Sequence, residues 1–304
     1  YNLNGAAPKI INCRFLQNVA DIGGGGMANL EAAPEVVETT FVENSSSQQG
    51  GGVVNNLSPG AVFVRCQFRE NKSFIFGGGM YNINSPVTID QTWFIRNADT
   101  EFGSGIANEN SNILLRSSFV VQNSSTVHGG GIYNKNSSPQ ILDCTIANNT
   151  SAFRGAGVYS VENSRPNFVN VILWDNLPEE LGATDTSGFT QSFTNLRNGG
   201  GDYNIEPAFF DPANLNYRLA AGSPMIDAGG NSLPAQGITA DFEGDARGFD
   251  GDGLGQITSD FSDYDVGADE FTGAPGAPIA FDEGEEIGGE GEGEGEGEGE
   301  GEGE

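Results

Sequence analysis

The residues best suited to chemistry lie in an acidic, glycine-rich stretch near the C-terminus. Carboxylates stand at alternate positions in two runs, namely Asp241, Glu243 and Asp245, and then Asp250 and Asp252. Alternating carboxylates in a glycine-rich loop are typical of calcium sites, because their oxygens can converge on one ion. Neither run completes an EF-hand, since Phe261 stands where the last acidic ligand would be. We expect at most a structural calcium ion here; alternatively, these aspartates cap turns and pair with Arg247.

Other residue types common in catalytic sites lack the partners that catalysis needs. His128 is the only histidine, and no Ser or Cys can be placed beside it from the sequence. We expect it to be a solvent-facing turn residue, because three glycines follow it. Glycine runs such as Gly24-Gly25-Gly26 lack the lysine and the helix of a phosphate-binding loop. We therefore assign no catalytic residue and no cofactor apart from the calcium.

Two motifs recur along residues 1–176 with the same period, which identifies the elements that must position any site. The first motif is an apolar residue, usually Phe, followed by two spacer residues and an asparagine. Its asparagines are 26 or 27 residues apart: Asn18, Asn44, Asn71, Asn97, Asn123, Asn149 and Asn176. The copy that begins at Phe119 carries one extra residue. A glycine followed by an aliphatic residue forms the second series, at Gly26, Gly52, Gly79, Gly105, Gly131 and Gly157. Two markers in one period predict about seven stacked coils.

Short strands are predicted just before each of these asparagines. Apolar residues alternate with polar ones, so that one face of a half-buried strand carries Ile11, Cys13 and Phe15. The fourth copy is irregular and suggests a β-bulge near Asp90. Strands separated by Gly, Asn and Ser turns every 26 residues predict an all-β fold, a right-handed parallel β-helix of the pectin-lyase-like type. Phe should stack inside it, and the asparagines should form a ladder in the turns.

Two further sets of side chains occupy repeated slots in these coils. Cys13, Cys66 and Cys144 share one slot, and coils at least two apart are too distant for a disulfide, so we expect three buried, reduced, inert thiols. Another slot, pointing outward, holds aromatic residues at Tyr81, Tyr133 and Tyr159. A stripe of rings could stack on sugars or on a partner. The alternative is packing between neighbouring coils or against a loop.

The alternation of Gly78-Gly79-Met80 with Phe68-Arg-Glu-Asn71 resembles the repeats of chlamydial polymorphic outer-membrane proteins and related bacterial β-helix proteins. A second resemblance covers about residues 203–271. The segments Asn204–Pro212, Tyr217–Gly229, Asp241–Arg247 and Asp265–Glu270 look like the domain called choice-of-anchor Q. The first resemblance implies a secreted or surface-exposed stalk, often an adhesin. The second implies export and attachment to the bacterial envelope, through an anchor that this chain does not show.

Three regions are predicted from these patterns. Residues 1–177 form the β-helix, residues 178–272 an irregular cap on the last coil, and residues 273–304 a disordered Gly/Glu spacer. This spacer holds 12 of the 42 acidic residues and no basic one. The chain starts at Tyr1 without a visible signal peptide, so we expect a fragment or a mature form.

The two resemblances imply an extracellular or cell-surface protein that binds a glycan or a protein. A formal net charge of −29 argues against nucleic acid and anionic membranes as partners. We expect a non-catalytic adhesin or scaffold. The alternative is a protein of the same fold that binds or degrades polysaccharides, since such enzymes pair acidic and basic residues in a groove. We find no acidic cluster that recurs one coil apart, and the outward positions are mostly Asn, Ser, Thr, Gln and Arg.

Overall fold

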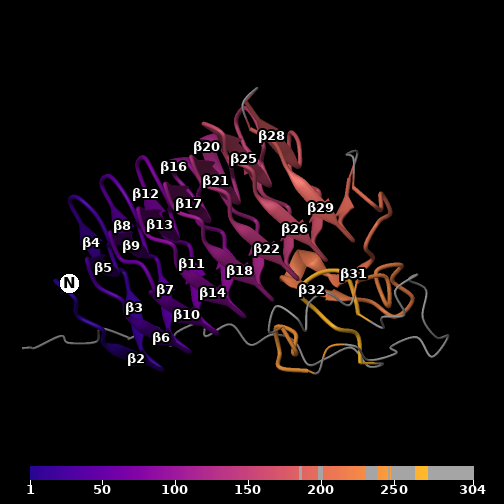
Figure 1. The fold of residues 1–304 in the computed structure, drawn as a ribbon, viewed down its shortest axis with the longest axis horizontal. Coiled ribbons are helices and arrows are strands. Elements are labelled where there is room, and N and C mark those ends of the chain that lie inside the picture. The colour runs from indigo at the N-terminus through magenta and orange to yellow at the C-terminus, as the bar shows by residue number, and fades with distance from the viewer. Residues whose placement is uncertain (185–186, 198–200, 231–237, 246, 248–263, 273–304) are drawn as a thin grey trace, which may run out of the picture.

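The computed structural model is a parallel β-solenoid and confirms the predicted all-β fold (Figure 1). It describes residues 1–184, 187–197, 201–230, 238–245, 247 and 264–272. Each coil gives one strand to each of three eight-stranded parallel sheets. In this part of the chain the only helix is the short 3-10 helix η1, Pro212–Asn214. The predicted spacer, 273–304, lies outside the described residues.

The strands of each sheet follow one another in chain order. Sheet A contains β1 (Asn2–Leu3), β5 (Met27–Leu30), β9 (Val53–Asn56), β13 (Met80–Ile83), β17 (Ile106–Glu109), β21 (Ile132–Lys135), β25 (Val158–Val161) and β28 (Leu181–Ala183). Sheet B contains β2 (Lys9–Ile11), β6 (Glu35–Val37), β10 (Val62–Val64), β14 (Thr88–Asp90), β18 (Leu114–Arg116), β22 (Gln140–Leu142), β26 (Asn167–Val169) and β29 (Thr190–Ser192). Sheet C contains β3 (Arg14–Leu16), β7 (Thr40–Val42), β11 (Gln67–Arg69), β15 (Trp93–Ile95), β19 (Phe119–Val121), β23 (Thr145–Ala147), β27 (Ile172–Trp174) and β30 (Asn195–Leu196).

A left-handed turn residue separates sheet B from sheet C in every coil and corrects two predictions. Its φ lies between +43° and +59° at Asn12, Glu38, Arg65, Gln91, Ser117, Asp143, Asn170 and Phe193. The predicted single strand from Ile11 to Phe15 is therefore two strands, β2 and β3. Because the turn changes the alternation, Ile11 points outward and is 54% exposed, whereas Phe15 packs against the core. Asp90 points outward for the same reason, and β14 pairs with both neighbours without the predicted bulge.

The register of sheet C also shows that the fifth copy of the repeat has no extra residue. Val120, not Phe119, pairs with Phe94 on one side and with Ile146 on the other. Val120 therefore fills the interior slot that Phe occupies in earlier coils, and Phe119 points outward. The sequence pattern placed Phe119 in the interior slot because Phe119 and Val120 are both apolar.

Stacked side chains fill the interior. The rings of Phe15, Phe41, Phe68 and Phe94 stack with centroids 4.7–4.8 Å apart. The glycine series lets successive coils approach closely, since a Cβ on Gly79 would lie 2.6 Å from the carbonyl oxygen of Gly105. The repeated glycines are thus required by packing between coils, as tight corners.

The solenoid continues past residue 177, where the period was expected to end. Leu181 of β28 pairs with Val158, only 23 residues earlier, and β29 and β30 extend the other two sheets. In the eighth coil the spacing is shorter and the turn residues differ. The 26-residue motif is therefore absent there, although the strands still pair with those of the seventh coil.

Residues 203–271, where described, form a cap that lies along the side of the solenoid (orange and yellow in Figure 1). Its first residues bond to the last coil, where Tyr203 and Ile205 meet Asn195 of β30. Its hairpin, β31 (Phe209–Asp211) and β32 (Asn216–Leu219), lies over the outer face of sheet C, where Leu215 and Tyr217 pack on Trp93 and Phe119. The physical reason is the outward face itself. The first outward position of each sheet C strand is polar in the first three coils, at Arg14, Thr40 and Gln67. The same position is apolar in the fourth, fifth and seventh coils, at Trp93, Phe119 and Ile172. Covering this apolar surface stabilises the cap there.

Candidate functional site

The cap is attached along the turn residues between sheets B and C in four consecutive coils. Gln91 Nε2 donates to the carbonyl of Asp241 at 2.6 Å. In the next coil, Ser117 Oγ donates to the carbonyl of Ala240 at 3.4 Å, and the two coils after that contribute Asp143 and Asn170. The amide oxygen of Asn170 accepts from the backbone of Gly230 at 3.0 Å. The attachment thus repeats with the period of the solenoid.

A fully buried arginine is the centre of this attachment. Arg247 Nη2 lies 2.6 Å from Asp143 Oδ2, and its Nη1 lies 3.0 Å from Glu270 Oε2. Burial raises the pKa of Asp143 well above its usual range, and the guanidinium of Arg247 only partly opposes this. The negative charges of Glu270 and Asp241 act in the same direction as burial. The cluster therefore contains more carboxyl groups than one arginine can neutralise.

Further carboxyl groups of the cap surround this pair. Burial raises the pKa of Asp269 to about 8, although the backbone N–H of Leu219 donates to it at 2.8 Å. Burial also raises the pKa of Asp241 to about 6 and that of Asp265 well above its usual range. Burial in the folded protein thus favours the protonated form of several aspartates.

The predicted calcium residues are only partly brought together. Carboxylate oxygens of Asp241, Glu243 and Asp269 lie within 4.8 Å of one another, and Asp269 was missed because it is distant in sequence. Asp245 is exposed and contributes its backbone, while Asp250 and Asp252 lie outside the described residues.

The bonds of these carboxylates match the turn caps of the alternative prediction, but not the pairing with Arg247. Asp241 Oδ1 accepts the backbone N–H groups of residues 243, 244 and 245, and its Oδ2 accepts that of Glu270. Glu243 forms an ion pair with Arg218. Arg247 pairs with Asp143 and Glu270, neither of which the sequence pattern had suggested. Calcium binding stays a prediction.

The tyrosine stripe on sheet A is covered by a segment of each coil that we call the arm, which carries Phe76, Phe102 and His128. Phe76 stacks on Tyr81 and His128 on Tyr159, with ring centroids 5.2 and 4.2 Å apart, and Phe102 packs at a tilt against Tyr133 at 5.0 Å. Tyr81 is 1% exposed, and its hydroxyl donates to Glu109 at 2.7 Å. The rings therefore pack against a loop, which is the alternative given above, and offer little open surface to a sugar.

His128 and the cysteines differ from their predicted environments. His128 ends strand β20 (Ser124–His128) and is half-buried against Tyr159, so it is not a solvent-facing turn residue; burial lowers its pKa. All three thiols are free, and Cys66 and Cys144 are buried as expected. Cys13 is exposed, because its coil is the first layer of the stack and has a neighbour on one side only.

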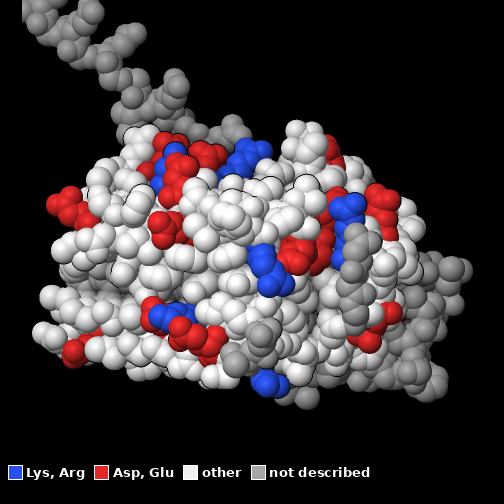
Figure 2. Space-filling model, turned by 90° about the horizontal axis from the view of Figure 1, so that it is seen from above, with Lys and Arg blue, Asp and Glu red and all other residues white. Residues whose placement is uncertain are grey.

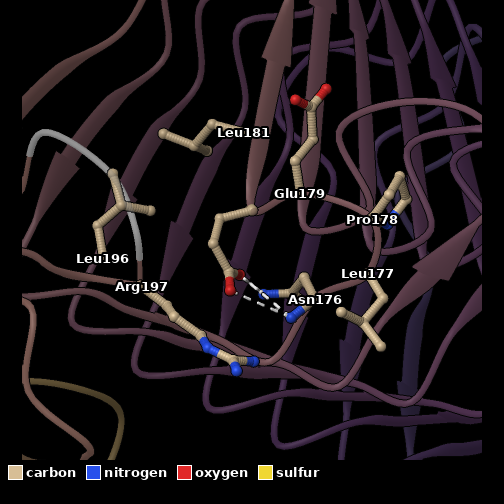
Figure 3. Close-up of a pocket in the computed structure, with 8 residues that line it drawn as sticks. Asn176, Leu177, Pro178, Glu179, Leu181, Leu196 and Arg197 are labelled. Carbon is tan, nitrogen blue, oxygen red and sulfur yellow. Dashed lines mark hydrogen bonds between the residues drawn. The ribbon is translucent and has the colours of Figure 1, made fainter.

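The asparagines form a continuous hydrogen-bonded ladder. Each side-chain oxygen accepts from the preceding Asn, and each Nδ2 from Asn44 onward also donates to the carbonyl of an interior residue one coil earlier. Asn29, Asn55, Asn82, Asn108 and Asn134 form a second buried ladder in sheet A. At the end of the first ladder, the carboxylate of Glu180 accepts from the backbone and side chain of Asn176 (Figure 3). Sequence reasoning missed Glu180, since it breaks the Asn pattern.

Charged side chains on the outer surface form pairs between adjacent coils. On the face drawn in Figure 2, Lys and Arg lie beside Asp and Glu. Two pairs between adjacent coils are Glu109–Lys135 at 2.9 Å and Asp90–Arg116 at 2.8 Å. The second pair lines a pocket of about 190 Å³ between sheet B and the cap. The sequence pattern did not indicate the ion pair between Asp90 and Arg116, although the two residues lie one coil apart.

Comparison with known proteins identifies no relative. No family model, no curated protein and no solved structure matches the chain. Within the described ranges, no helix is both long and apolar enough to pass through a membrane.

Proposed function

We propose that this protein is a non-catalytic adhesin or scaffold of the bacterial cell surface or the extracellular space. The observation that carries the proposal is that packing occupies the groups that looked functional. The tyrosine rings lie under the arm, Asp241 caps a turn, and His128 stacks on Tyr159. The surface that remains open to a partner is therefore the extended outer face of the solenoid, where charged side chains pair between adjacent coils.

The likeness to chlamydial polymorphic outer-membrane protein repeats and to choice-of-anchor Q domains belongs to this proposal. Such a chain would be exported and held to the envelope. Its partner would be a glycan or a protein on another surface. Nucleic acid is a poor partner for a chain with a net charge of −29. No cofactor is required, although calcium at Asp241, Glu243 and Asp269 would stabilise the cap.

One observation favours the alternative, a polysaccharide-binding or polysaccharide-degrading protein. The Asp90–Arg116 pair places an acidic and a basic group beside a pocket, and both side chains are partly exposed. Burial raises the pKa of Asp90, which suits a group that exchanges a proton. Arg116 holds this carboxylate, however, and in the described residues no second carboxyl group faces it across the pocket.

The test is incubation of the protein with acidic and neutral polysaccharides, with calcium and with EGTA, while retention and chain cleavage are followed. We expect no cleavage of any polysaccharide. Cleavage that Asp90→Asn abolishes would replace the adhesin proposal with the enzyme. Retention without cleavage would make the protein a glycan-binding module, and the EGTA arm would show whether calcium matters.

A further inference from the structure

A pocket of about 280 Å³ opens where the asparagine ladder ends, at the last coils of the solenoid (Figure 3). Its wall combines polar groups with leucine side chains, and its main lining residues are Asn176, Leu177, Glu180, Leu181, Leu196 and Arg197. Leu177 is 57% exposed at the mouth, whereas Leu196 is buried. The pocket thus combines polar and apolar walls, and the carboxylate of the buried Glu180 lies among them.

That carboxylate has hydrogen-bond donors but no counter-ion. Glu180 is 6% exposed and accepts the backbone N–H of Asn176 at 3.2 and 3.3 Å and its side-chain N–H. Within the part of the chain that the structure describes, no Lys or Arg side chain comes within 4 Å of it. Arg197, on the same wall, pairs with Asp175 and lies over the ring of Trp174, 5.8 Å from its centroid.

A buried carboxylate without a cation is unfavourable, and the molecule relieves this only by taking up a proton. Burial raises the pKa of Glu180 to about 7, and the hydrogen bonds from Asn176 only partly oppose it. The negative charge of Asp175 acts with burial, and Arg197 acts weakly against it. Glu179, at the rim, pairs with Arg154 and does not neutralise Glu180. A cation from outside would therefore be bound most strongly when Glu180 is ionised.

The shape and bonding of the pocket favour an ammonium group on an alkyl chain. The carboxylate already accepts N–H groups from Asn176, so few lone pairs remain, and a planar guanidinium could not bind it in the bidentate manner. A compact ammonium needs only one oxygen, and its methylene chain can lie on Leu181 and Leu196. The net charge of −29 attracts basic partners toward the surface.

We propose that this pocket binds the side chain of a lysine from a partner protein, with the ammonium on the carboxylate of Glu180 and the methylenes on the leucines. The proposal holds whether the solenoid acts as an adhesin or as an enzyme, since it concerns a pocket remote from Asp90 and Arg116. The proposed contact is one lysine on a basic surface of the partner.

The test is NMR titration of the full chain at pH 8 with Nα-acetyl-lysine N-methylamide, and with the norleucine analogue as the uncharged control. We expect saturable shifts at the pocket with lysine only. Glu180→Gln keeps an acceptor for Asn176 and should weaken binding at least tenfold, while Glu179→Gln should change it less than twofold. Lowering the pH to 5.5 should weaken binding by wild type, because Glu180 then takes up a proton.

Three results would overturn the proposal: no saturable lysine binding by wild type, equal binding of norleucine, or equal affinity in the folded Glu180→Gln variant. A thermal unfolding curve of each variant establishes that it is folded. If Glu179→Gln weakens binding as much as Glu180→Gln does, the attraction is a general effect of negative charge, and the pocket is not the site.

Discussion

Asn97 shows what a single residue of the ladder contributes. Its side-chain oxygen accepts two hydrogen bonds from Asn71, and its Nδ2 donates to the carbonyl of Phe68 and to Asn123, all between 2.9 and 3.0 Å and buried. Replacement by Ala would leave several buried polar groups without partners, because water cannot reach them. We expect Asn97→Ala to lower the free energy of unfolding by about 3 kcal/mol.

Asn18 is the matched control, since it occupies the same slot in the first coil but is exposed. Its side chain bonds only to Asn44, and water can replace that partner. Asn18→Ala should cost less than about 1 kcal/mol in urea unfolding. Equal costs for the two variants would mean that burial does not set the energy of the ladder.

The three thiols should differ in reactivity because their burial differs. Burial raises the pKa of Cys66 to about 12 and raises that of Cys144 as well, so neither forms a thiolate at pH 8. Cys13 is exposed. We expect one thiol per native chain to react with a chromogenic disulfide reagent, and three after denaturation. Cys13→Ser should abolish the native reaction; a native reaction that persists would show that a buried thiol is accessible.

At the scale of elements, the cap depends on the ion pair between Arg247 and Asp143. Replacing Arg247 by Met would leave Asp143 and Glu270 buried without their counter-ion, which costs about 3–5 kcal/mol. We expect the cap to leave the side of the solenoid. Trp93, whose ring meets Phe242 at 5.1 Å, would then be exposed to water. In a Trp174→Phe background, its fluorescence should shift to longer wavelength while far-UV circular dichroism keeps its β signal.

Arg65→Met is the control for this prediction. Arg65 pairs with Glu38 in the corresponding turn of earlier coils, but both side chains are about half exposed. Its loss should change stability by less than about 1 kcal/mol. If Arg247→Met left the emission of Trp93 and the unfolding curve unchanged, the buried pair would not hold the cap.

At the scale of the whole molecule, the acidic groups make docking of the cap depend on pH. The pKa of Asp241 is raised to about 6 and that of Asp269 to about 8, because both carboxyl groups are buried in the folded protein. Folded-state values above the unfolded ones mean that their stabilising contribution is complete below about pH 4. It is then lost as the pH rises through 6 and 8.

We therefore expect the cap to undock more readily at pH 9 than at pH 5.5. The measurement is the urea midpoint for the change in Trp93 fluorescence, taken across this range in the Trp174→Phe protein. Glu180→Gln should leave the pH dependence of this midpoint unchanged, because Glu180 lies at the end of the solenoid and not under the cap. A midpoint that rises with pH would contradict the burial of these carboxyl groups.

The sequence by itself determined the repeat, the strands and the ladder. Glycine at Gly79 and asparagine at Asn97 recur because every coil has the same neighbours above and below, so local chemistry is copied with the period. The interior Phe stack follows from the same rule. A periodic structure can be predicted from its period alone, because each residue's partner is one repeat away.

What the tertiary structure decided is everything that the period does not specify. The turn at Gln91 reverses which residues point inward, and only its left-handed backbone reveals this. The side of the solenoid under the cap, the partners of Arg247 and the arm over Tyr81 join segments that are not one repeat apart, or that differ from coil to coil. Such contacts follow from apolar area and charge that become adjacent only after the coils have stacked, and this is why the candidate sites, unlike the fold, required the structure.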